Sequence, residues 1–449
     1  MKRLFELTLV ARLLFPFFDS PLNHLYSDPQ RHWDNGALFL HPGIMGSSDP
    51  YLYQVWMFLL RWITDSYGPA VLLGCGLLCA AMPLGWYRAL RELLPKPWAL
   101  GGAFVIALIP ESVSIYAYFM NETLLMTLLG FCIWLTLRSH RKRTFSAFTL
   151  ACLAWSCVAL TRTIALPMAV GCIAGLWLTQ SQRPQKLLIA AVVAGALIVP
   201  AGQHAARTLG YFAPFGNLYF NSIYHDSGMR DIRVDYGPYG RYQFGAPSFY
   251  NPTYYPFSDW TTDRRGTMNI TINTAHGRAD WKREQARVNS LRQFPVWRQR
   301  WEDFQYLLFG QNWPNSDHST FIGEATLWGR WMWAPLLLFL AWAVVRRWFA
   351  GPSWLLPVCG LGTVGLLALQ TQGVTEARFR EPIDAMLVAA AVCAVYFRFG
   401  RSGAARSRQP TVLPLPEPQQ QTLSHAVVHR AQQPIEATEH CHDRRGDDV

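Results

Sequence analysis

The chain has 449 residues, of which 51% are hydrophobic and only 15% charged, and its formal net charge is +11. These proportions favour a membrane protein, but a mean hydropathy of only +0.08 excludes a bare bundle of spans. None of the cysteines falls between residues 203 and 326, so no disulfide framework is expected in that polar insert.

Apolar segments of membrane-spanning length occur along most of the chain. The first follows Met1, Lys2 and Arg3 like a signal peptide, but no small-x-small cleavage site comes after it, so we expect a retained anchor. A span needs about 17 to 25 mainly apolar residues. Ten segments meet this requirement, at 4–20, 68–87, 98–117, 120–137, 145–161, 163–179, 187–204, 328–345, 353–371 and 382–398.

A polar loop rich in acids, residues 19–50, follows the first apolar segment. It contains three carboxylates and a basic and an imidazole side chain, namely Asp19, Asp28, Asp34, Arg31 and His32. Acids beside cationic and aromatic residues at a bilayer surface are suited to binding a lipid-linked phosphate and moving what it carries.

The remaining segments are more polar. Residues 51–67 are aromatic and short, which predicts a helix lying flat at the membrane interface. In the insert, residues 235–260 are expected to form a loop because Gly and Pro recur every few residues. Residues 279–309 predict a helix broken near Pro295, and the Pro/Gln/Arg-rich tail cannot bury a core.

The short turns between the predicted spans are basic, and they all fall on one side together with Lys2 and Arg3. The positive-inside rule then places both termini in the cytoplasm and both large loops outside. The predicted organisation has four parts: an N-terminal membrane module 1–202, an outer insert 203–326, C-terminal membrane helices 327–399 and a disordered cytoplasmic tail 400–449.

Four short motifs carry a resemblance to a known superfamily. They are YSDPQRHWDNG from Tyr26, PESVSIYAYFMNETLL from Pro110, LTRTIAL from Leu160 and EARFREP from Glu376. In their order the chain resembles the GT-C superfamily of membrane glycosyltransferases, which use polyprenyl-phosphate sugars and include protein O-mannosyltransferases and the lipid A aminoarabinose transferase. The resemblance covers about residues 1–400 and implies a catalytic carboxylate in the first outer loop, at the place of Asp28.

The chemistry also follows from the residues. Transfer of a sugar from phosphate with inversion needs one carboxylate to deprotonate the acceptor, while the leaving phosphate needs cationic contacts. Asp28 is the first choice as base because Arg31 and His32 lie one helical turn away, where they can orient it or hold phosphate. Asp34 and Asp19 are the next candidates, and each of the three has the alternative of a solvated loop acid or a helix cap.

Glu111 and Glu122 lie at the ends of adjoining predicted spans, where a carboxylate is a candidate functional group. The alternative is a favourable interaction with the helix dipole. If a divalent metal is used, Asp28 and one of these glutamates are the expected oxygen ligands, although nothing in the sequence requires a metal.

Three arginines interrupt or precede apolar segments: Arg162, Arg378 and Arg380. The forked guanidinium stays charged and binds phosphate with two hydrogen bonds, so these are candidates, with Arg31, for holding the donor phosphate. The alternative is an arginine at a helix end whose side chain reaches the lipid headgroups.

The sequence therefore predicts an all-α polytopic membrane protein of GT-C-like architecture, in the inner membrane of a bacterium. We expect an inverting glycosyltransferase that passes a sugar from a polyprenyl-phosphate donor to a lipid, glycan or protein on the outer face, with no nucleic-acid partner. The alternatives are an O-antigen-type polymerase or ligase, a transporter or flippase of lipid-linked sugars, and a structural scaffold. A transporter predicts broken spans in matching halves.

Overall fold

A computed structural model describes residues 1–25, 27–43, 49–64, 66–215, 231–236, 242–244, 266–271, 296–309, 325, 328–369 and 379–400. The chain divides into two units, Met1–Gly403 and Ala404–Val449, and every described residue belongs to the first. The tail that the sequence predicts beyond Gly400 lies outside the described residues.

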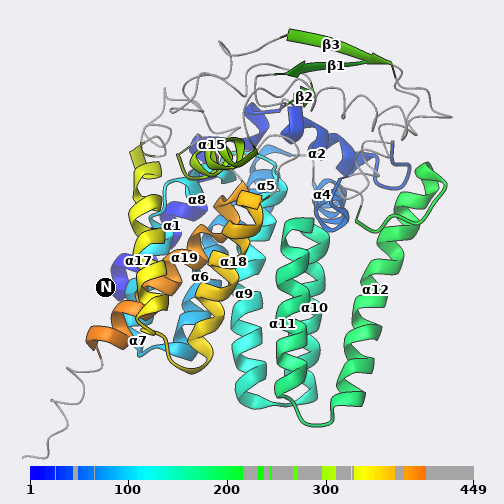
Figure 1. Ribbon diagram of the computed structural model, residues 1–449. Helices are drawn as coiled ribbons and strands as arrows, with labels where there is room; N and C mark the ends of the chain where they lie inside the picture. Colours follow the sequence, from blue (N-terminus) through cyan, green and yellow to red (C-terminus); the bar gives the residue numbers. More distant parts are fainter. Residues whose placement is uncertain are drawn as a thin grey trace, which may run out of the picture. The chain divides into compact units, whose positions relative to one another are not determined.

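Helices make up most of the described residues (Figure 1). In the N-terminal half they are α1 (Lys2–Phe18), α2 (Ser27–Ala37), α4 (Tyr51–Ile63), α5 (Tyr67–Val71), α6 (Leu77–Leu93), α7 (Lys96–Ala107), α8 (Glu111–Ser114), α9 (Asn121–Lys142), α10 (Phe145–Thr161), α11 (Leu166–Thr179) and α12 (Arg183–Leu209). The later helices are α15 (Val296–Phe309), α17 (Trp333–Val345), α18 (Leu355–Leu369) and α19 (Glu381–Val395). Short 3₁₀ or π turns adjoin them at Pro21–Asn23, Leu72–Gly76, Ile115–Ala117, Thr163–Ala165, Arg330–Met332, Gly351–Trp354 and Tyr396–Gly400.

Five helical stretches in the described residues are long and apolar enough to cross a membrane: Gly68–Leu93, Asn121–Lys142, Arg183–Thr208, Gly351–Leu369 and Glu381–Gly400. They become six if the bent pair α7 and α8 counts as one span. The helices α1, α10, α11 and α17 are apolar but shorter. Each of the ten predicted segments overlaps a helix in the described residues, so the chain is compatible with a polytopic membrane protein, and the number of ten spans stays a prediction.

Over the predicted span 98–117 the helix is broken, and its crossing of the membrane as one span stays a prediction. The helix α7 ends at Ala107, and the next turns bend away by 71°. Pro110 causes the break because proline disfavours helical backbone in the residue before it and lacks a donor for the helical ladder. Arg12 occupies the break from α1, with Nη1 2.9 Å from the carbonyl oxygen of Ala107 and Nη2 2.7 Å from that of Ser112.

The core of the bundle is built by close approach of helices. A Cβ atom added at Gly130 in α9 would lie 2.8 Å from the backbone nitrogen of Trp86 in α6, so the two backbones touch there. Trp155 of α10 donates from its indole nitrogen to the hydroxyl of Thr136, at 2.8 Å. Close glycine contacts and a bonded buried indole are features of tightly packed helices in lipid.

Two short helices, α2 and α4, lie beyond the ends of the long helices, opposite the turns that join α9 to α10 and α11 to α12 (Figure 1). Trp33 of α2 is buried and stacks on Phe119 at a centroid distance of 4.8 Å. In α4, Tyr53 and Met57 face inwards while Trp62 is 77% exposed. The predicted helix over residues 51–67 is thus confirmed for residues 51–63, where α4 ends, and its place at a membrane interface stays a prediction.

The insert contains β-structure that the sequence analysis did not predict. The strands β1 (Asp231–Tyr236), β2 (Tyr242–Phe244) and β3 (Gly266–Thr271) form an antiparallel sheet in the order β2-β1-β3. Tyr236 pairs with Tyr242, which corrects the expectation of a plain loop over 235–260. The predicted helix break near Pro295 agrees with the start of α15 at Val296.

Candidate functional site

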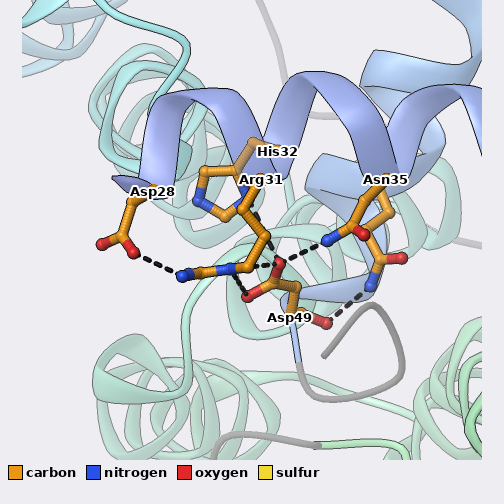
Figure 2. A network of polar contacts seen from close by, with 6 residues as sticks. Asp28, Arg31, His32, Asn35 and Asp49 are labelled. Atoms are coloured by element: carbon orange, nitrogen blue, oxygen red, sulfur yellow. Dashed lines mark hydrogen bonds and ion pairs between the residues drawn. The ribbon is translucent and has the colours of Figure 1, made fainter. Parts of the chain in front are cut away.

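One face of α2 collects the polar residues of the first predicted outer loop. The spacing i, i+3, i+4, i+7 places four polar side chains on one side of this helix, namely Asp28, Arg31, His32 and Asn35. Pro29 is tolerated in the first helical turn because its missing N–H would have no partner there. Figure 2 shows Arg31, His32 and Asn35 in contact with Asp49, and Asp28 in contact with Arg31.

Arg31 joins two carboxylates. Its Nη1 atom lies 2.5 Å from Oδ1 of Asp28, and its Nε atom lies 3.0 Å from Oδ2 of Asp49 (Figure 2). The Arg31 and Asp28 side chains are 30% and 24% exposed, whereas that of Asp49 is only 7% exposed. The pair Asp28–Arg31 is therefore accessible to a ligand, and the buried Asp49 holds Arg31 in place.

Asp49 is the residue that sequence reasoning missed. Its carboxylate also accepts from the side-chain amide of Asn35 at 2.6 Å, and its backbone carbonyl accepts from the amide of Gln54 at 2.8 Å. The signal available in the sequence is an Asp-Pro pair directly before the aromatic segment, which reads as an ordinary helix start. Its partnership with α2 depends on how α2 packs on α4, which no local pattern shows.

The charges of this cluster are set by burial and by the two aspartates. Burial opposes the charged form of Arg31, but Asp49 and Asp28 outweigh it and raise the pKa of the guanidinium. Burial lowers the pKa of His32 below its ordinary value of 6.5, although Asp49 opposes the shift. His32 is therefore a neutral, buried ring near pH 7, which suits packing and positioning rather than binding of phosphate.

A second pair lies at the same end of the long helices. Arg162, which caps α10, forms an ion pair through Nη1 with Oε1 of Glu122 in the first turn of α9. The same nitrogen lies 3.4 Å from the amide oxygen of Asn121, and the guanidinium lies over the ring of Phe379 at 5.0 Å. Glu122 is 1% exposed and the Arg162 side chain 12%, so the arginine is the accessible member of the pair.

Electrostatic contacts link the two pairs. The Glu122 carboxylate lies within electrostatic range of His32, on the side of the first cluster, and of Glu381, at the start of α19. The first outer loop, the fourth predicted span and the last one therefore meet at one end of the bundle. His32 of the first cluster and Glu122 of the second pair therefore lie near each other, although they are far apart in the sequence.

A third group of charges is fully buried. Arg380 binds Asp384 through Nε at 2.8 Å and through Nη2 at 3.3 Å, and its Nη1 donates to the carbonyl oxygens of Leu307 and Leu308 in α15. Its guanidinium also lies over the ring of Trp333 at 4.3 Å. The expectation that Arg380 binds the donor phosphate does not hold, because its 1% exposed side chain is committed to joining α15 and α19.

Two glutamates lie beside that group. The indole nitrogen of Trp333 donates to Oε1 of Glu111 at 3.3 Å, and Glu111 is 1% exposed. Glu381 is 0% exposed, and neither of its oxygens has a hydrogen-bond partner among the described residues. Glu111 is thus a buried structural acid in this conformation, and Glu381 and Asp384 are buried acids that the sequence analysis did not single out.

No protein-family model matches this chain, and no curated protein matches it. The assignment of chemistry therefore depends on the site itself.

The remaining predicted site residues lie apart from this region or outside the described residues. Asp34 is exposed on another side of α2, and Asp19 accepts from His24 at 2.6 Å in the turn after α1. Arg378 lies outside the described residues. Within the described ranges, no three His, Cys, Asp or Glu side chains are grouped so as to hold a metal ion, so a metal role for Asp28 with Glu111 or Glu122 gains no support.

Proposed function

We propose that this protein is an inverting glycosyltransferase that takes a sugar from a polyprenyl-phosphate donor and passes it to a lipid, glycan or protein acceptor outside the membrane. The observation that carries the proposal is the accessible Asp28–Arg31 pair, anchored by buried Asp49 at the end of the membrane helices. The four motifs similar to those of GT-C glycosyltransferases support the same reaction class.

In this proposal Asp28 is the general base. An acceptor hydroxyl gives its proton to the carboxylate while its oxygen attacks the anomeric carbon, and the bond from that carbon to the phosphate oxygen breaks on the opposite face. Arg31 orients Asp28 through the 2.5 Å contact. Asp49, which accepts a hydrogen bond from Asn35, in turn fixes Arg31, so the base is held by a rigid support.

The leaving phosphate needs cationic contacts. Arg31 uses Nε and Nη1 for the two aspartates, and no hydrogen bond joins its Nη2 to another described residue, so this nitrogen is available to a donor oxygen. Arg162 uses Nη1 for Glu122 and is partly exposed, which leaves the rest of its fork for the same phosphate. Two arginines without a metal provide sufficient positive charge for a good leaving group.

One structural feature favours the alternative of a transporter, and another argues against it. The break between α7 and α8 resembles the discontinuous helices of transporters. Within the described residues, however, no second pair of helices is bent in this way, and transporter sites come from matched halves. The acids in question also lie at helix ends, which suits chemistry on a headgroup at the membrane surface.

The test is a transfer assay with the full chain reconstituted in vesicles. Radiolabelled polyprenyl-phosphate sugars, one pentose and several hexoses, are supplied with a mixed acceptor extract, and loss of label from the donor is measured. The proposal predicts that at least one donor is consumed, and only by protein whose α2 side faces the donor. Movement of intact donor across the bilayer without loss of its sugar would instead establish a flippase.

A further inference from the structure

An apolar cavity of about 690 Å³ lies between α9, α11 and α18, away from the proposed catalytic region. Glycines form much of its wall: Gly171 and Gly175 on α11 and Gly362 on α18. A Cβ atom added at any of the three would meet no atom within 4 Å, so the space is open. A cavity of this size and lining in a membrane-spanning region is suited to hydrocarbon chains.

The cavity continues into a polar one at the end of the helices that carries the basic turns. The second cavity has a volume of about 380 Å³ and shares Leu137, His140 and Pro352 with the first. Its other lining residues include Arg141 and Arg143. At the opposite end, the apolar cavity is lined by Pro167, Met168 and Leu366, without a cationic side chain. The polar part of an occupant must therefore lie at the basic end.

The charges at this end favour an anion. Glu92 neutralises Arg141 through contacts of 2.8 Å and 3.4 Å. Arg143 has no ion-pair partner among the described residues, and its backbone carbonyl accepts from the buried ammonium of Lys186 at 3.0 Å. This bond fixes the turn in which Arg143 has φ 56°, a left-handed conformation that usually favours glycine or asparagine. Arg143 is thus held in the wall of the polar cavity, which adjoins the apolar one.

We propose that this pair of cavities binds an anionic phospholipid of the cytoplasmic leaflet, with its phosphate at Arg143 and an acyl chain between α11 and α18. Basic pockets between membrane helices on the cytoplasmic side are known to suit anionic headgroups. A polyprenyl-phosphate donor fits less well, because its phosphate belongs at the other end, beside Arg31 and Arg162. This lipid site goes beyond glycosyl transfer, and only the exclusion of the donor as its occupant rests on the proposed function.

Native mass spectrometry of the full chain released from nanodiscs of phosphatidylglycerol and phosphatidylethanolamine tests the headgroup contact. Wild type should retain phosphatidylglycerol. Arg143→Asn should weaken this retention about five-fold, because that factor corresponds to the attraction of one cation to a charged membrane surface. Arg347→Asn is the matched control, since Arg347 is an exposed arginine with φ 55° that lines neither cavity. Equal effects of the two substitutions, or equal retention of both lipids, would overturn the proposal.

A phosphatidylglycerol with a photoreactive acyl chain tests the apolar cavity. The lipid should label α11 or α18 in wild type, and Gly175→Leu should abolish that labelling by filling the space. Gly195→Leu in α12 is the control, because Gly195 also has open space around it and lines neither cavity. Gly171→Leu gives a second filling variant if Gly175→Leu lowers the unfolding midpoint. Undiminished labelling in either folded variant, or labelling of wild type by polyprenyl phosphate instead, would refute the site.

Discussion

Arginines that look alike in the sequence differ in what their guanidinium groups touch. Arg12 and Arg380 are 2% and 1% exposed and donate to carbonyl oxygens of neighbouring segments, so they join parts of the bundle. Arg31 and Arg162 are partly exposed and each shares its fork with an acid. This difference in exposure, which follows from tertiary packing, separates structural arginines from candidates for phosphate binding.

Arg162 has two possible roles that a pair of substitutions can separate. Arg162→Met removes the phosphate ligand but also the ion pair with the buried Glu122 carboxylate, which lowers the free energy of unfolding. Adding Glu122→Gln removes that buried charge. We therefore expect the double variant to regain the unfolding midpoint of Glu122→Gln while its apparent affinity for the donor stays weak.

The readouts for this pair are thermal unfolding in detergent and the donor concentration at half-maximal transfer. Arg162→Lys is a useful third variant, because it keeps the charge and loses the fork, and it should weaken donor use only in part. If the double variant uses the donor as well as Glu122→Gln does, Arg162 serves only to neutralise Glu122.

His32 should make the packing of α2 sensitive to pH. Its folded-state pKa lies below the ordinary value of 6.5, so the unfolded chain binds the proton more readily. Stability is therefore complete above that ordinary value and falls as the pH drops below it, by at most about 1.4 kcal/mol per pH unit. Asp49, Arg31, Asp28 and Glu122 are the charged groups that act on the ring.

The measurement is the unfolding midpoint at pH 7 and pH 5 for wild type and for His32→Gln. The neutral glutamine should reduce the difference between the two values. An equal drop in wild type and His32→Gln would assign the pH dependence to other groups.

At the scale of elements, the break between α7 and α8 depends on Arg12. A helix that ends inside a membrane leaves carbonyl oxygens that need donors, and the Arg12 guanidinium supplies them for Ala107 and Ser112. Its Nε also donates to the carbonyl oxygen of Cys79 in α6, where Pro83 has no N–H to offer. Arg12→Met should lower the free energy of unfolding by at least about 2 kcal/mol, since several buried acceptors lose their partner. Arg3→Met, at an exposed position of the same helix, should have little effect.

Chemical or thermal unfolding in one detergent compares the two variants directly. Similar midpoints for Arg12→Met and Arg3→Met would mean that the break does not need the guanidinium.

Local sequence patterns predicted several elements and missed others for identifiable reasons. The apolar segments predicted the long helices, and Pro295 predicted the start of α15. The spacing of Asp28, Arg31 and His32 already indicated one helical face, yet the low hydrophobicity of residues 27–37 suggested a loop. The β-strands were missed because frequent Gly and Pro obscure alternation, while backbone pairing across β1 does not require it.

The contacts that define the candidate site could not be predicted from the sequence. Asp49 meets α2 because α4 folds back on it, and Glu122 meets Arg162 because α9 and α10 form a hairpin. Both depend on the packing of whole helices. The buried position of Arg380 likewise depends on α15, more than 70 residues earlier in the chain.

At the scale of the whole molecule, the orientation in the membrane stays a prediction with a direct test. Figure 1 shows the turns α9–α10 and α11–α12 at the end opposite α2 and α4. The basic residues of these turns predict that this end is cytoplasmic. Reporter fusions at residues 140 and 420 should therefore give cytoplasmic signals, and fusions at residues 30 and 260 should not. A cytoplasmic signal at 260 would reverse the orientation.

The central claim is that Asp28 removes a proton from the acceptor, and two substitutions on one helix test it. Asp28→Asn keeps the size of the side chain but cannot accept the proton, so single-turnover transfer should fall by about two to four orders of magnitude. Asp34→Asn, at an exposed position of α2 away from the cluster, should transfer at the wild-type rate. Near-wild-type transfer by Asp28→Asn in vesicles, with normal folding and insertion, would contradict the account.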